Sequence, residues 1–196
     1  NPTANFLGNN FALTKTGAND SWLVDVGASG LADINVNQGL FGVQGTSTLG
    51  NSANTLTAAA GTRVGIWNSD INVLNKKWVL TGASLQSLSG NNTISGTMTL
   101  TGTNTFSSTS IFNVQSAISG AGAITKTGSG ILRLSSANLF TGNISVSTGT
   151  LTVGNATALG STNGSTIIAN DARLDLNGYN LGAEPVIAQG NGFGNA

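Results

Sequence analysis

GAGAITKTGSGILRLSSANLFTGNISVSTGTLTVGNATALG, residues 120–160, is the stretch of sequence that decides the fold. Its short runs repeat apolar residues at the spacing of strands with one buried face; these residues are Ile131 and Leu134, Ile144 and Val146, and Leu151 and Val153. Glycine-containing steps separate the runs, but no Asn-Gly pair in this stretch is placed for a two-residue hairpin. The pattern therefore favours strands joined by corners, as in a coil of stacked rungs, over a meander.

An internal repeat extends this pattern over most of the chain. The sequence FALTKTG of residues 11–17 anticipates AITKTG at 123–128, and seven further pairs coincide at a separation of 110 residues: Ile34/Ile144, Val36/Val146, Gly39/Gly149, Phe41/Leu151, Val43/Val153, Leu49/Leu159 and Gly50/Gly160. We predict that Ile34, Val36, Val43, Ile144, Val146 and Val153 point into one continuous core. The expected fold is all-β, a single-stranded parallel β-helix (solenoid) without helices.

The repeat also predicts how the chain is organised. Residues 1–196 should form one continuous β-helix, with related copies at about 11–68 and 122–178 and connecting rungs at 71–120. Rungs of about 18–25 residues give about eight to ten rungs, and thus a rod about 40–45 Å long at the usual strand spacing. Because the sequence begins with Asn1 and not Met, we expect it to be a segment of a longer chain.

Residues 118–160 resemble the autotransporter-associated β-strand repeat, also called the passenger-associated transport repeat. The resemblance rests on Lys-Thr-Gly at 126–128, Gly-Ile-Leu-Arg-Leu-Ser at 130–135, Asn-Leu-Phe-Thr-Gly at 138–142 and Gly-Thr-Leu at 149–151. Family members carry Asn-Thr-Tyr-Thr-Gly as the third element, so this chain departs there but keeps the aromatic residue. The resemblance implies a right-handed parallel β-helix exported to the bacterial surface, and it implies no catalysis.

Composition excludes several classes of function. Seven basic residues balance seven acidic ones without a run of either sign, so nucleic acid and anionic lipid are not expected as partners. Histidine and cysteine are absent, which removes the usual nucleophile–base pairs and most metal sites. We therefore expect no catalytic residue, no metal and no cofactor. No apolar run approaches about 18 residues, so membrane insertion of this segment is not expected.

Carboxylates are the remaining candidates for chemistry. Alternation places Asp171, Arg173 and Asp175 on an outer face, with Ala172, Leu174 and Leu176 inside. This group is either an exposed ion pair along a strand or a hydrolytic pair with its own arginine. The first copy has no carboxylates at the matched positions 61–65, which favours the ion pair. The other acidic residues at 20, 25 and 33 are interpreted as solvated surface.

Aromatic residues offer one candidate binding site. Trp22, Trp67 and Trp78 could form a platform on which sugar rings stack, or they could be corner packing between rungs.

Three functional hypotheses follow from these observations. The first is a non-enzymatic structural rod or fibre segment at a bacterial cell surface, the second an adhesin segment that binds glycan, and the third a polysaccharide-active enzyme on the same scaffold. The expected location is extracellular. Residues 1–10 and 190–196 are nearly uncharged and poor in helix-forming sequence, so they offer no cap for the ends of the coil. The expected partners are therefore copies of the chain, or flanking repeats, stacked end to end.

Overall fold

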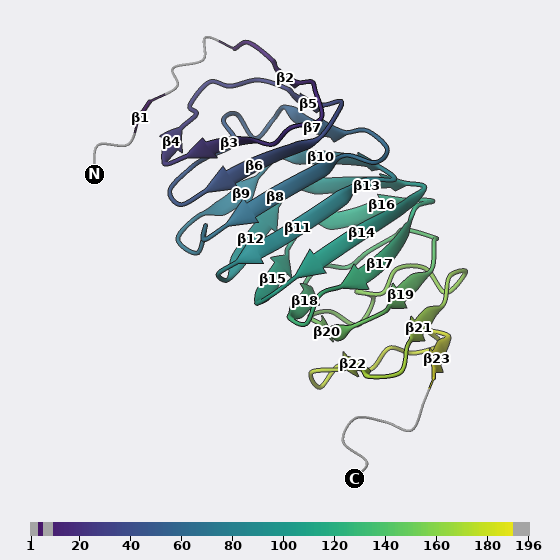
Figure 1. The fold of residues 1–196 in the computed structure, drawn as a ribbon. Helices are drawn as coiled ribbons and strands as arrows, with labels where there is room; N and C mark the ends of the chain where they lie inside the picture. The colour runs from purple at the N-terminus through teal and green to yellow at the C-terminus, as the bar shows by residue number, and fades with distance from the viewer. Residues whose placement is uncertain (1–3, 6–9, 190–196) are drawn as a thin grey trace.

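The structure is a computed structural model that describes residues 4–5 and 10–189. The described chain is an all-β parallel solenoid of about nine turns, which confirms the predicted fold class. Every strand pair is parallel, and strands of successive turns lie directly over one another from β2 at one end to β23 at the other (Figure 1). Most of the predicted terminal segments 1–10 and 190–196 lie outside the described residues.

Three parallel sheets form the sides of the coil. Sheet B contains β2 (Leu13–Lys15), β5 (Ile34–Val36), β7 (Thr55–Ala58), β10 (Lys77–Thr81), β13 (Thr97–Thr101) and β16 (Ala117–Gly120). Sheet C contains β3 (Ser21–Val24), β6 (Leu40–Gln44), β8 (Arg63–Trp67), β11 (Ser84–Ser89), β14 (Thr103–Ser108), β17 (Ala123–Thr127), β19 (Ile144–Val146), β21 (Thr166–Ile168) and β23 (Val186–Ala188). Sheet D contains β9 (Val73–Asn75), β12 (Asn92–Ser95), β15 (Ile111–Val114), β18 (Ile131–Leu134), β20 (Gly149–Val153) and β22 (Ala172–Asp175). A separate pair joins β1 (Ala4–Asn5) to β4 (Val26–Gly27).

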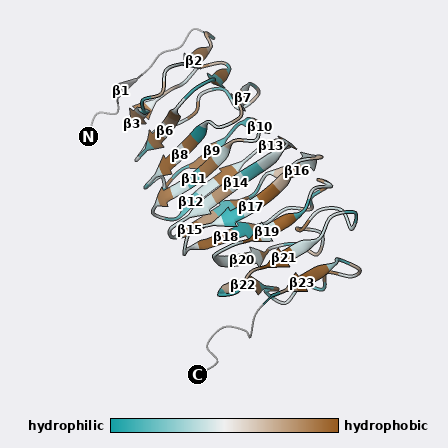
Figure 2. Cartoon of the chain, turned by 45° about the vertical axis from the view of Figure 1, so that its right-hand side comes forward, coloured by the Kyte–Doolittle hydropathy of each residue, from teal (hydrophilic) through white to brown (hydrophobic). Residues whose placement is uncertain are grey.

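One apolar core runs through the coil. Strand alternation sends every second side chain inward, and the hydropathy colouring accordingly varies from residue to residue along the strands (Figure 2). The six predicted core residues are all buried, so their inward assignment is confirmed: Ile34, Val36, Val43, Ile144, Val146 and Val153. Aromatic rings take part in the core: Phe106 and Phe112, from neighbouring sheets, have ring centroids 6.5 Å apart.

Two predicted inward positions are wrong. In β18 the buried residues are Leu132 and Leu134, while Ile131 is only half-buried. Residues three apart in a strand point to opposite faces, so Ile131 and Leu134 cannot both point inward. The inward residues are Leu132 and Leu134, and Ile131 is the residue just before them. Leu176 is 45% exposed because it follows the last residue of β22, in the final turn, where no further rung covers it among the described residues.

Buried asparagines join successive rungs at the corners. Asn138 accepts a hydrogen bond from the Ile118 backbone N–H at 2.9 Å and donates to the Ala158 carbonyl at 2.6 Å. Asn92 and Asn104 accept from backbone N–H groups of the preceding rung in the same way. These side chains satisfy backbone groups that the strand ladders leave unpaired at the corners.

Candidate functional site

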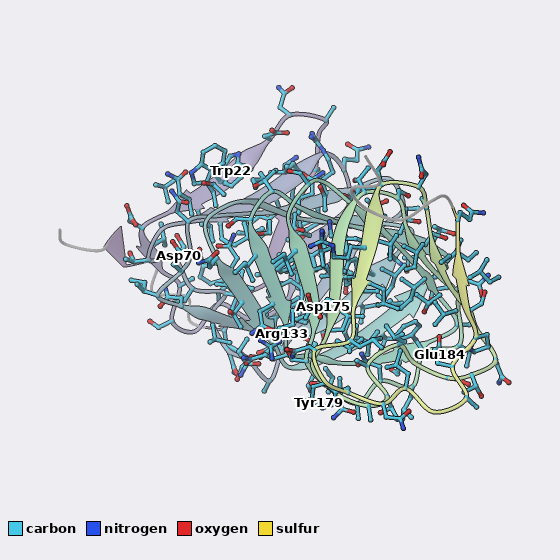
Figure 3. The ribbon with its side chains drawn as sticks, turned by 90° about the horizontal axis from the view of Figure 1, so that it is seen from below. Trp22, Asp70, Arg133, Asp175, Tyr179 and Glu184 are labelled. Carbon is cyan, nitrogen blue, oxygen red and sulfur yellow. The ribbon has the colours of Figure 1, made fainter. Side chains whose placement is uncertain are left out.

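Trp22 lies on the outer face of sheet C, near its N-terminal end (Figure 3). The strand register places Trp22 beside Gly42 of β6, which pairs in turn with Gly65 of β8. A Cβ atom on Gly42 would lie 2.3 Å from Trp22 Cε3, and one on Gly65 would lie 3.1 Å from Trp22 Cη2. The six-membered ring therefore lies flat across both glycines. A larger residue at position 42 would displace it.

A shallow hollow of 510 Å³ adjoins this ring and is lined by Trp22, Val24, Gln44 and Trp67. Val24 pairs with Gln44, and Gln44 pairs with Trp67, so three successive rungs supply the lining. The Trp67 residue is 42% exposed. Within residues 10–189, neither the Gln44 amide nor the two indole N–H groups have a hydrogen-bond partner. We call these four residues the Trp22–Trp67 groove.

Trp78 cannot belong to this surface, and that part of the predicted platform is wrong. Trp78 is only 1% exposed, in the inward column of β10, between Leu56 and Met98 of the neighbouring rungs. Its Nε1 donates a hydrogen bond to the Ser95 carbonyl at 2.8 Å. The ring is thus core packing, and its N–H is satisfied inside the coil.

Charged residues next to the groove are already partnered. Arg63 donates to Asp20 at 3.0 Å in an exposed ion pair. Asp25, which follows Val24, accepts hydrogen bonds from the Thr46 backbone N–H at 2.9 Å and from the Thr46 hydroxyl at 3.1 Å. Asp20, Asp25 and Arg63 together carry one net negative charge, so these groups give the groove no net positive charge.

The remaining carboxylates are dispersed over the coil and take part in local hydrogen bonds. Asp175 accepts from the Asn177 backbone N–H at 2.9 Å and from the Thr152 hydroxyl at 3.4 Å. Asp33 is only half-buried, and the hydrogen bond from the Thr55 backbone N–H lowers its carboxyl pKa. Asp171 and Arg173 are exposed, as predicted. No group of three potential metal ligands gathers anywhere in the described chain.

Sequence reasoning missed a set of buried lysines. Lys126 turns inward, and its Nζ donates to the carbonyls of Thr127 and Gly128, both at 2.7 Å, and of Thr148 at 3.3 Å. Gly128 has a φ of +78°, and a Cβ there would lie 2.4 Å from the Ser108 carbonyl oxygen. Burial lowers the pKa of Lys126 to about 8, which leaves the ammonium group protonated at pH 7.

The first copy repeats this corner. Lys15 Nζ donates to the carbonyls of Thr16 at 2.9 Å, Gly17 at 2.6 Å and Gln38 at 3.1 Å. The Lys-Thr-Gly element is therefore a corner in which the lysine closes its own turn and ties it to the next rung. Its recurrence in both copies was the signal that could have revealed this role from the sequence.

Lys76 closes a third corner without a Lys-Thr-Gly element. It is fully buried, and its Nζ donates to the carbonyls of Ala32 at 2.6 Å, Leu49 at 2.8 Å and Asn51 at 2.9 Å. Nothing in the sequence separates it from the exposed Lys77 beside it.

No helix in residues 4–5 and 10–189 is long and apolar enough to span a bilayer. The comparisons with known proteins match parts of the chain. The family model described as Passenger-associated-transport-repeat matches residues 95–113 and 124–153. A relative is the Adhesin BmaC autotransporter of Brucella suis biovar 1 (strain 1330), which is 40% identical over 73 residues. That match covers 37% of this chain and 2% of the relative, so the chain corresponds to a small part of the relative's length. No solved structure matches. Residues 95–113 and 124–153 therefore carry passenger-associated transport repeats, the family that the Lys-Thr-Gly and Gly-Thr-Leu elements resemble.

Proposed function

We propose that this chain is a non-enzymatic structural segment of an extracellular passenger, a stiff rod at a bacterial cell surface. The observation that carries this proposal is the unbroken stack: sheet C alone continues through nine strands with one core behind it. Each rung is held by its neighbours through backbone ladders and by asparagine and lysine corners. The passenger repeats in the middle of the chain support export to the cell surface.

The distribution of acidic groups supports a non-enzymatic role. Hydrolysis of a glycosidic bond by the usual route needs two carboxyl groups facing one another across the substrate. Here Asp175 is engaged with Thr152 and Asn177, and Asp20 is paired with Arg63. We expect no release of reducing sugar from neutral or acidic polysaccharides. Release that is lost in Asp175→Asn would show an enzyme instead.

The final turn favours a partner stacked on its end. Val186 of β23 is 43% exposed, and it lines a hollow of 620 Å³ together with mostly apolar residues, among them Leu174 and Tyr179. The outer edges of β22 and β23 pair with no strand in the described part of the chain. Open strand edges above an apolar layer recruit further strands. We propose that flanking rungs, or a second copy, continue the stack there.

Two substitutions in β23 test the stacking. Val186 lies in the inward column over Thr166, whereas Ile187 lies in the outward column over Ile167. We expect the 196-residue chain to associate end to end in sedimentation velocity. Val186→Lys should abolish this association because it places a charge on the stacking surface, and Ile187→Lys should leave it intact. A parent chain that stays monomeric at every concentration would refute stacking between copies.

A further inference from the structure

We propose that the Trp22–Trp67 groove binds a neutral glycan by stacking the apolar faces of its pyranose rings on the two indoles. This binding site goes beyond the structural role proposed above and does not depend on it. The groove lies on the outer face of sheet C, outside the core, where β6 and β8 end at Gln44 and Trp67. A ligand can therefore be bound without any change in the stack of rungs.

The glycine pair under Trp22 is the first argument. Glycine weakens a strand interior, and it commonly marks a place where something must approach the backbone closely. Gly42 and Gly65 occupy adjacent outward positions. The Trp22 ring fills the space that a side chain on Gly42 would take, and it borders the space above Gly65 together with Leu40 and Leu88. The ring is thereby held flat against the sheet, and its opposite face is turned outward. Trp22 is only half-buried in this position.

The spacing of the two indoles is the second argument. Trp22 and Trp67 stand two rungs apart with β6 between them, which places their backbones about 10 Å apart along the coil axis. This is the scale of a short oligosaccharide rather than a single small molecule. Exposed aromatic rings that are held rigidly contribute binding area at little cost in conformational entropy.

Hydrogen-bonding groups in the groove match hydroxyl-rich ligands. The Gln44 amide lies between the indoles and offers both a donor and an acceptor, without a partner in the structure described. The two indole N–H groups are further donors that have no partner within residues 10–189. A ligand that carries many hydroxyl groups can satisfy these atoms, whereas a purely apolar ligand would leave them unpaired.

Charge selects a neutral glycan. Arg63, in the same strand as Trp67, is paired with Asp20, and Asp25 follows Val24 along the chain. A carboxylated or sulfated sugar would therefore meet one unbalanced negative charge and no free positive charge. Neutral hexose chains avoid this repulsion.

Isothermal titration of the 196-residue chain tests the proposal with defined probes: cellohexaose, maltohexaose, mannohexaose, N-acetylchitohexaose and hexagalacturonate. We expect at least one of the four neutral probes to bind and hexagalacturonate to fail. Trp67→Ala should weaken binding about tenfold, the scale of a lost aromatic contact. Gly42→Val, which displaces the Trp22 ring while leaving the inward column unchanged, should weaken binding to a similar extent. Leu139→Ala is the matched control, since Leu139 is an exposed apolar residue (77%) far along the chain, and it should leave affinity unchanged.

Circular dichroism of each variant establishes that the coil is retained. Failure of all four neutral probes would overturn the proposal. It would also be overturned by preferential binding of hexagalacturonate, or by neutral binding that Trp67→Ala and Gly42→Val leave intact. Loss of concentration-dependent self-association in Trp67→Ala, without sugar binding by the parent, would assign the groove to contacts between copies and would equally refute the glycan site.

Discussion

Leu85→Asp should unfold the centre of the coil. Leu85 is fully buried in β11, with Val64 and Phe106 directly before and after it in the inward column. A carboxylate there would lie between two apolar side chains, and the nearest lysine of the column, Lys126, is two rungs away beyond Phe106. The expected loss in the free energy of unfolding therefore exceeds about 4 kcal/mol. Because each rung rests on its neighbours, the damage should spread to both sides of β11.

Gln86→Asp is the matched control for this substitution. Gln86 is the next residue of the same strand and lies in the outward column beside Gly65 and Ser107. The same charge at this position should change stability by less than about 1 kcal/mol. Urea titrations followed by circular dichroism compare the two variants. Equal midpoints would show that the inward assignment is wrong. Val146 is a poorer choice for this test because Lys126 lies beside it and could pair with an introduced carboxylate.

Lys76→Met should also cost stability, by about 2–4 kcal/mol. Methionine keeps much of the volume but offers no donor to the three carbonyls that Lys76 Nζ contacts within 3 Å. The Ala32 and Leu49 carbonyls accept no other hydrogen bond in the described structure. The removal of a buried charge offsets part of this loss. Lys77→Met is the control, because Lys77 is exposed, and its effect should be within about 0.5 kcal/mol.

The effect of Lys76→Met on the free energy of unfolding should also depend on pH. Burial lowers the pKa of Lys76 to about 8 from its ordinary value of 10.5, although the carboxylate of Asp33 opposes the shift. Between these two values the unfolded chain holds a proton that the folded chain has released, so the free energy of unfolding rises with pH in this window. The stability difference between parent and Lys76→Met should therefore grow from pH 8 to 10.5. A stability difference that stays constant over this pH range would show that the Lys76 ammonium group is exposed to water in the folded chain.

Much of the coil could be predicted from the sequence because its signals are local. The inward positions of Ile144 and Val146 follow from a period of two, and positive-φ corners follow from Gly128 and its equivalents. The error at Ile131 arose at the start of a strand, where two apolar residues, Ile131 and Leu132, are adjacent. Local spacing cannot tell which of two adjacent apolar residues turns inward at such a point.

The candidate site could be predicted only in part because it is assembled across rungs. Trp22, Gly42 and Gly65 come together through a lateral register of about twenty residues that no sequence window reveals. Nothing in the sequence distinguishes Trp67 from Trp78, yet the Trp67 side chain points outward and the Trp78 side chain points into the core. Lys76 and Lys77 differ in the same way.

Distances between paired spin labels test the continuous stack most directly, and the absence of native cysteine makes labelling specific. One outward column of sheet C runs through Ser84, Thr105, Thr125, Ser145, Ile167 and Ile187. With one label at position 84 and the second at 145, 167 or 187, the partners are three, four and five strand spacings away, about 14, 19 and 24 Å between backbones. We predict narrow distance distributions whose means increase by about 5 Å at each step. Distances that do not increase along the column, or that are broad at every pair, would contradict a single rod of stacked rungs.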